Sequence, residues 1–147
     1  MIRHIWSVLC SRSVIDTTSN NISLLEVVEK ITFVGPGGIG FAPTQLELVS
    51  LWSRSDFAAP ERGRGRVTVM SQAGVTLHPS TVFDIDLNTY LRVRSRLQIG
   101  GLPVIADARF YEFRIELERE GVWGEVGSIP LELEISIQPA APELAAR

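Results

Sequence analysis

The chain has 147 residues, of which 45% are hydrophobic and 21% are charged, and its formal net charge is −3. This length suits a single domain with a core large enough to be stable without disulfides or structural metals. A small negative charge provides no general attraction to nucleic acid or to anionic membrane surfaces, so we expect neither as a partner. The only cysteine, Cys10, excludes an internal disulfide framework and favours a reducing compartment.

The N-terminal segment from Met1 to Cys10 starts with charged residues and then becomes hydrophobic. Its hydrophobic run is only about six residues long and no small-residue cleavage site follows it, so we expect no signal peptide. No window of the chain approaches the ~20 hydrophobic residues that a membrane span needs. We therefore predict a cytoplasmic protein.

The first third of the chain predicts one strand, one loop and one ambiguous segment. Ile2 to Cys10 is hydrophobic on both parities, which indicates a strand covered on both sides or a strand whose outer face meets a partner. Asp16 to Asn21 is a cluster of turn-forming residues and predicts a loop. Ile22 to Phe33 has hydrophobic residues at helical spacing, but its β-branched residues favour a strand. We predict a strand there, with a helix as the alternative.

The middle of the chain predicts further strands. Gln45 to Ser53 is a strand whose hydrophobic residues change parity between Leu48 and Val49, which a bulge at that point would explain. Phe83 to Ile99 is long enough for one bent strand or for two strands that join near Asn88. The remaining segments are predicted as a glycine-rich loop, a polar connection and a short strand, in this order: Val34–Gly40, Arg54–Arg66 and Val67–Met70.

The clearest pattern in the sequence lies between Ala108 and Ile137. Hydrophobic residues occupy the odd positions on either side of a turn at Glu120 and Gly121, and charged residues occupy most of the even positions. Side chains of a strand point alternately to opposite faces, so each run predicts a half-buried strand of a hairpin. We predict that residues 1–138 form one β-sandwich domain, and that residues 139–147, rich in Ala and Pro, form a flexible tail.

Seven to nine short strands separated by turns, with little or no helix, predict an all-β antiparallel sandwich. The order of a few segments is familiar: Cys10 at the end of the first strand, Ile22–Ile31, Gln72–Gly74, Tyr111–Leu117 and Ile129–Leu131. In this order the chain resembles small bacterial immunoglobulin-like β-sandwich proteins of an uncharacterised domain family. The resemblance covers roughly Ile5 to Ile137 and implies an immunoglobulin-like fold, a strand at Ile22–Phe33, and no known activity, cofactor or catalytic residue.

Three polar residues alternate along the outward face of a predicted strand: Asp84, Asp86 and Asn88. Their spacing is similar to the start of a calcium loop. A calcium loop needs a glycine and a later carboxylate, and Tyr90 and Arg96 stand at those positions. Along a strand, alternate side chains are also ~7 Å apart and do not converge. A solvated face is the simpler interpretation, and Asp84 and Asp86 remain candidates for an ion bound together with loop carboxylates. We expect no other cofactor or metal.

Two features are candidates for partner binding. Arg92, Arg94 and Arg96 form a basic row on one parity, which indicates either a charge ladder with neighbouring strands or a surface for an acidic partner. Trp123 follows the hairpin tip and is the best candidate for an exposed contact residue. The carboxylates considered for the charge ladder are Glu112, Glu116 and Glu132.

The residues that catalysis would need are few. His4, His78 and Cys10 are the only histidines and the only cysteine, and nothing marks a nucleophile elbow or a metal-binding pair. We therefore expect no catalytic residue and no enzyme. The predicted function is a non-catalytic module for protein binding or self-assembly, because sheet edges and both-sided hydrophobic strands need covering. The alternative is a sandwich that binds an ion or ligand, such as calcium.

The charges of the last hairpin suggest how copies would associate. Its outward face carries several glutamates, whereas the preceding strand carries the arginine row. If the chain changes sheet near Gly100 and Gly101, the domain has one acidic and one basic face, and two copies stack through them. The glutamates concerned are Glu116, Glu118, Glu132 and Glu134.

Overall fold

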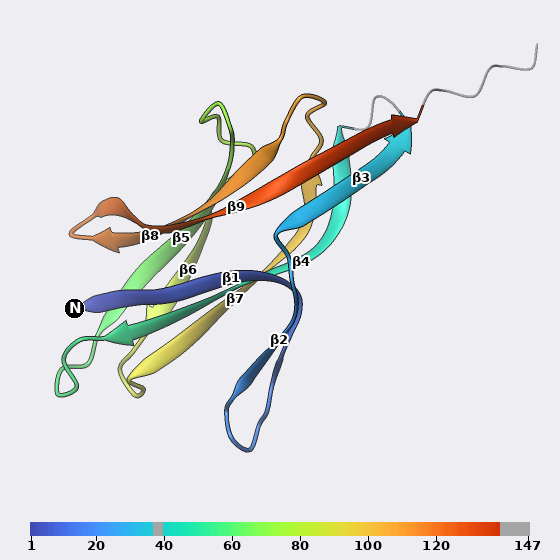
Figure 1. Cartoon of the computed structure of the whole chain (residues 1–147). Helices are drawn as coiled ribbons and strands as arrows, with labels where there is room; N and C mark the ends of the chain where they lie inside the picture. The colour runs from blue at the N-terminus through green and yellow to red at the C-terminus, as the bar shows by residue number, and fades with distance from the viewer. Residues whose placement is uncertain (37–39, 139–147) are drawn as a thin grey trace, which may run out of the picture.

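The computed structural model describes residues 1–36 and 40–138, in which the chain forms nine strands and no helix. The strands lie in two sheets (Figure 1), one in the order β2-β1-β4-β7 and one in the order β3-β9-β8-β5-β6. The prediction of an all-β chain is confirmed. The bounds are β1 (Ile2–Ile15), β2 (Ile22–Val27), β3 (Lys30–Pro36), β4 (Phe41–Arg54), β5 (Arg62–Ser71), β6 (Thr81–Asp86), β7 (Arg92–Pro103), β8 (Phe110–Arg119) and β9 (Val122–Gln138).

Parts of two predictions lie outside the described residues. These are the predicted tail, residues 139–147, and residues 37–39 of the predicted glycine-rich loop. Val34 to Pro36, assigned to the same loop, instead complete strand β3. Across the described parts of the chain, no helix is long and apolar enough to cross a membrane.

The core lies between the two sheets and follows the alternation predicted from the sequence. β8 contributes four inward side chains from Tyr111 to Leu117, each at most 2% exposed, as the parity of the last hairpin predicted. Trp52 of β4 is fully buried opposite them and packs against Phe83 of β6, with ring centroids 5.9 Å apart. Burying side chains of this size stabilises the fold by about 1.5–3 kcal/mol each.

The ambiguous segment Ile22–Phe33 consists of two strands, so the strand prediction is confirmed and the helix alternative is wrong. β2 forms a hairpin with β1, and β3 then runs parallel to β9 in the other sheet. The path changes at Glu26, whose φ of 51° interrupts the extended backbone. One sequence segment therefore joins the two sheets.

The predicted connection Arg54–Arg66 is wrong over its last residues, because β5 begins at Arg62. Gly63 and Gly65, which indicated a loop, instead lie inside the strand. A Cβ at Gly65 would collide with the ring of Phe83, the residue directly opposite on β6. Glycine in a strand interior commonly marks such a close approach. The arginines between the glycines consequently alternate along the outer face.

Phe83–Ile99 forms two strands, β6 and β7, which lie in different sheets. The predicted bulge between Leu48 and Val49 is wrong, because the register of β4 with β7 shifts between Pro43 and Leu46 instead. β4 is hydrophobic on both parities because both of its faces are covered. Val49, on the face away from the core, is 0% exposed.

The hairpin of β1 and β2 covers this outer face of β4. After Cys10, β1 leaves β4 and turns sharply into the hairpin (Figure 1). The backbone N–H of Ser13 donates to the carboxylate of Glu47 at 2.6 Å, and the hairpin tip accepts a hydrogen bond from Arg94 through the carbonyl of Asn20 at 2.8 Å. On this outer side, Val49 of β4 and Cys10 of β1 are 0% exposed, whereas Trp6 and Val8 of β1 are partly exposed.

Candidate functional site

The outer face of the five-stranded sheet is held by arginine–glutamate pairs between β5 and β8. Arg64 donates two hydrogen bonds of 2.6 Å to Glu118, and Arg66 donates two of 2.6 and 2.7 Å to Glu116. The indole of Trp123 lies under both arginines, with its centroid 4.5 Å from Cζ of Arg66 and 5.9 Å from Cζ of Arg64. Trp123, predicted as an exposed contact, is therefore partly buried by cation–π contacts.

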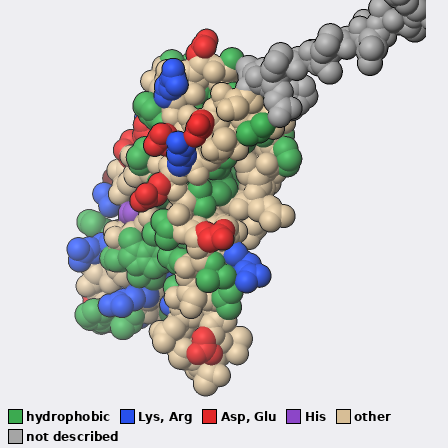
Figure 2. Space-filling model, turned by 45° about the vertical axis from the view of Figure 1, so that its right-hand side comes forward, with side chains coloured by type: hydrophobic (Ala, Val, Ile, Leu, Met, Phe, Trp, Pro, Cys, Tyr) green, Lys and Arg blue, Asp and Glu red, His purple; other side chains and the backbone are tan. Residues whose placement is uncertain are grey.

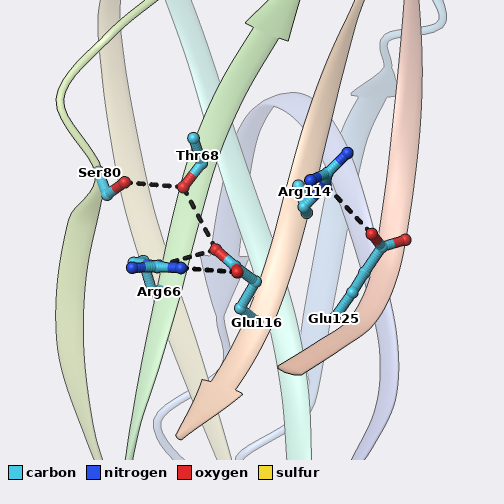
Figure 3. Close-up of polar contacts among 6 residues, drawn as sticks. All are labelled: Arg66, Thr68, Ser80, Arg114, Glu116 and Glu125. Carbon is cyan, nitrogen blue, oxygen red and sulfur yellow. Dashed lines mark hydrogen bonds and ion pairs between the residues drawn. The ribbon is translucent and has the colours of Figure 1, made fainter. Parts of the chain in front are cut away.

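Figure 3 shows how the pairs continue across this face. Glu116 also accepts a hydrogen bond from Thr68 at 3.4 Å, and Arg114 pairs with Glu125 at 3.1 Å. The hydrogen bonds from Arg66 hold the pKa of Glu116 below its ordinary value, so this carboxylate is charged and neutralised in place. The face is therefore not the bare acidic surface predicted from the sequence. The predicted stacking of two copies, through one acidic and one basic face, is therefore not supported.

Acidic and basic side chains are also interspersed on the face seen in Figure 2. On β3 and β9, Lys30 lies 2.7 Å from Glu134 and 3.9 Å from Glu132. These pairs account for the remaining predicted glutamates of the last hairpin. Surface pairs of this kind contribute little to stability, but they place a positive charge between the two glutamates.

The two calcium candidates, Asp84 and Asp86, lie on the outer face of the edge strand β6 beside arginines. Asp86 pairs with Arg62 at 3.0 Å and accepts the N–H of Asn88 at 2.9 Å, and Asp84 is in register with Arg64. Within residues 1–36 and 40–138, no group of three or more His, Cys, Asp or Glu side chains is placed to hold a metal ion. The structure does not bring the two carboxylates together with a third ligand of these types.

The residues considered for catalysis lie mostly inside the fold. The ring of His4 packs on Trp52 with centroids 5.0 Å apart, and its Nε2 is 2.7 Å from Oγ of Ser7. Burial lowers the pKa of His4, which favours the neutral ring. The thiol of Cys10 is 0% exposed and donates to the carbonyl of Glu47 at 3.6 Å, and burial raises its pKa. These contacts join β1 to β4.

The arginine row lies on the outer face of β7, in the other sheet from the last hairpin. A ladder with Glu112, Glu116 or Glu132 is therefore wrong, because those residues belong to the five-stranded sheet. Instead, Arg96 bonds to Glu47 at 2.9 and 3.0 Å, and Arg94 donates to the neutral carbonyl of Asn20. Arg92 forms no ion pair with any carboxylate of the described residues.

The strand register adds to the basic row a residue that sequence patterns did not reveal. Ser53 of β4 is paired with Arg3 of β1 on one side and with Arg92 of β7 on the other. Both arginines are exposed. They are distant in the sequence, and only strand pairing reveals that they flank the same serine. Arg3 therefore extends the basic row across the sheet.

The backbone of β7 has an open edge. β7 is the last strand of its sheet, and the N–H of Arg54 donates to the carbonyl of Leu91 at 3.2 Å. The register continues unbroken from Arg92 to Ile99, and residues of an antiparallel pair bond to the partner strand alternately. The residues whose N–H and C=O groups point to β4 are thus Val93, Ser95, Leu97 and Ile99. The residues that direct them to the open edge are Arg92, Arg94, Arg96 and Gln98.

A cavity of about 240 Å³ opens beside this edge, between β7 and the start of β6. Its floor includes Val67 and Val69 of β5, which are 6% and 7% exposed and belong to the core. Phe41, 53% exposed, lies on Gly101 at one end, where a Cβ would collide with its ring. The other lining residues are His78, Pro79, Thr81, Leu97, Gln98, Ile99, Gly100 and Leu102.

The edge and the cavity together can accept a strand. An added strand would pair with the backbone groups that β7 directs outward, and its inward side chains would enter the cavity. Local sequence patterns did not reveal this site, because its lining comes from strands far apart in the chain. No protein-family model matches the chain, and no curated protein matches it.

Proposed function

We propose that the protein is a non-catalytic immunoglobulin-like β-sandwich that binds another polypeptide in extended form along β7. The observation that carries the proposal is the open edge of β7 beside a cavity floored by core residues. We further propose that it belongs with the bacterial immunoglobulin-like proteins that its sequence resembles. Its one buried thiol, Cys10, suits the reducing cytoplasm, which we propose as its compartment.

The strand pairing supports an immunoglobulin-like arrangement. In such folds strands A, B, E and D form one sheet and C, F and G the other. β1, β4 and β7 pair in the order A, B, E, and β5, β8 and β9 pair in the order C, F, G. The hydroxyl of Tyr111, at the start of β8, donates to the carbonyl of Pro103 at 2.5 Å, as in the tyrosine corner of these folds.

This comparison also supports the location of the binding site. Strand D would pair with the strand that corresponds to β7, but among the described residues no strand takes that place. The backbone edge is left unpaired there, and the cavity between β7 and the start of β6 opens beside it. A strand from another chain would occupy the position of strand D.

The expected affinity is modest. Backbone hydrogen bonds contribute about 0.5–1.5 kcal/mol net each, and one buried hydrophobic side chain contributes about 1.5–3 kcal/mol. The loss of freedom on association offsets much of this gain. We therefore expect dissociation constants that are micromolar or weaker for a short peptide.

A library of displayed twelve-residue peptides, selected on the immobilised protein, tests the proposal. Binding of the enriched peptides to the wild type and to Thr81→Trp, which puts a large side chain at a residue lining the cavity, is then measured by fluorescence anisotropy. Thr32→Trp is the matched control, because Thr32 is also an exposed threonine on an edge strand of the same sheet. We expect Thr81→Trp to weaken binding at least tenfold and Thr32→Trp to leave it unchanged. No enriched peptide, or equal binding by both variants, would overturn the proposal.

A further inference from the structure

We infer that the segment bound along β7 alternates hydrophobic with acidic residues and comes from a different protein rather than from a second copy of this chain. The inference rests on the proposed strand addition and specifies its ligand. Successive side chains of a strand point to opposite faces. Each face of an added strand therefore meets a different part of the site.

The inward side chains of the added strand would enter the cavity. The residues that alternate with the acidic ones should therefore be hydrophobic. Leu97 and Ile99 of β7 line it from one side, and the core residues Val67 and Val69 form its floor. Its volume of about 240 Å³ exceeds the about 150 Å³ of an apolar cavity that holds benzene. It is smaller than the about 300–1,000 Å³ of most small-molecule sites. This size suits one or two hydrophobic side chains of a bound strand.

The outward side chains of the added strand would lie beside the arginine row. Every second residue of the bound segment should therefore be acidic. Side chains directly opposite on neighbouring strands lie about 4.5–5.5 Å apart at their Cβ atoms, so opposite charges attract there and like charges repel. Arg94 bonds only to the neutral Asn20, through its carbonyl and its side-chain amide oxygen, and Arg92 pairs with no described carboxylate. Glu47, which is 1% exposed, is paired with Arg96, so these two groups together present little net charge to an incoming strand.

The same row disfavours a second copy as the occupant. If two copies pair through antiparallel β7 strands, their four-stranded sheets join into one. The outer faces of both sheets then lie on the same side of the joined sheet. The arginine row of one copy would then lie beside the arginine row of the other. Like charges on adjacent strands destabilise the pairing. An acidic segment of another protein removes this repulsion and adds attraction.

Three fluorescein-labelled nine-residue peptides test the inference: one alternating Leu with Glu, one alternating Leu with Lys and one alternating Ser with Glu. We expect the Leu/Glu peptide to bind at least tenfold more tightly than either of the others in anisotropy titrations at low salt. Arg92→Glu should reverse the preference between Glu and Lys. Arg109→Glu, at an exposed arginine before β8, is the matched control and should change nothing.

The possible failures are distinguishable. If the Leu/Glu and Leu/Lys peptides bind equally and Thr81→Trp weakens both, the charge preference is overturned. The proposed strand addition is not. Peptide binding that Thr81→Trp does not affect, or no binding of any peptide, would overturn the proposed function as well. A homodimer in sedimentation that Thr81→Trp dissociates would identify a second copy as the occupant and overturn the inference.

Discussion

Glu47 and Arg96 form an ion pair on the outer face of the four-stranded sheet in which the carboxylate is buried and the guanidinium is not. Their closest atoms are 2.9 Å apart, and their side chains are 1% and 39% exposed. Glu47 also accepts hydrogen bonds from the N–H of Ser13 and from Gln98, at 2.6 and 2.8 Å. One carboxylate therefore joins the β1–β2 hairpin to β7.

Replacing this carboxylate should destabilise the fold. In Glu47→Gln, the donors of Ser13, Arg96 and Gln98 lose a charged acceptor, and the new amide group brings donors of its own. We expect a loss of about 1–3 kcal/mol in the free energy of unfolding, measured by urea denaturation. Glu134→Gln, in an exposed pair with Lys30, is the control and should show no measurable change. Equal losses in both variants would contradict the role of burial.

The same carboxylate should make stability depend on pH. Burial raises the pKa of Glu47, but the hydrogen bonds from Ser13 and the charge of Arg96 outweigh burial and hold it below the ordinary value of 4.5. The stabilisation is thus complete above about pH 4.5 and is lost as the pH falls through the lower folded-state pKa. We expect the difference in unfolding free energy between wild type and Glu47→Gln to shrink on acidification. Parallel pH profiles would contradict this assignment.

Gly65 should not tolerate a side chain, although it lies in a strand. A Cβ at this position would collide with the ring of Phe83, which packs on Trp52 in the core. We expect Gly65→Ala to cost about 1–3 kcal/mol in urea denaturation, as other overpacked cores do. At Gly124 a Cβ meets nothing within 4 Å, so Gly124→Ala should be neutral or slightly stabilising. A neutral Gly65→Ala would show that Phe83 moves aside at little cost.

The hydroxyl of Tyr111 should contribute to stability where the chain passes between the sheets. Tyr111→Phe removes its hydrogen bond and leaves the carbonyl of Pro103 without this donor. We expect a loss of about 1–2 kcal/mol, seen as a lower urea midpoint at unchanged slope. Tyr90 is 65% exposed, so Tyr90→Phe should leave the midpoint in place. A midpoint for Tyr111→Phe equal to that of wild type would contradict the role of this bond.

Local alternation predicted the parts of the fold that depend on neighbouring residues. The odd positions from Tyr111 to Leu117 are buried as the pattern indicated, because strand geometry alone decides which face they share. The same logic failed where contacts between distant segments decide. Gly65 indicated a loop, but the ring of Phe83 fills the space beside it. The change of parity in β4 indicated a bulge between Leu48 and Val49, but the β1–β2 hairpin covers the outer face of this strand.

The site could be predicted only in part, for a related reason. The arginine row on β7 was found from its parity, since its members are close in the sequence. Its extension to Arg3 depends on the register of both strands beside Ser53. The cavity depends on which sheet edge is left uncovered, and no local pattern encodes that. Trp123 was correctly placed after the hairpin tip, but its two arginine neighbours come from β5.

The most direct test of strand addition is amide hydrogen exchange of β7, measured by NMR with and without the Leu/Glu peptide. In the free protein we expect slow exchange at Val93, Ser95 and Leu97, whose N–H groups bond to β4, and fast exchange at Arg92, Arg94 and Arg96. The peptide should slow exchange at these arginines and leave the protected residues unchanged. The proposed binding edge is contradicted if saturating peptide leaves exchange along β7 unchanged. It is also contradicted if exchange slows only in the five-stranded sheet.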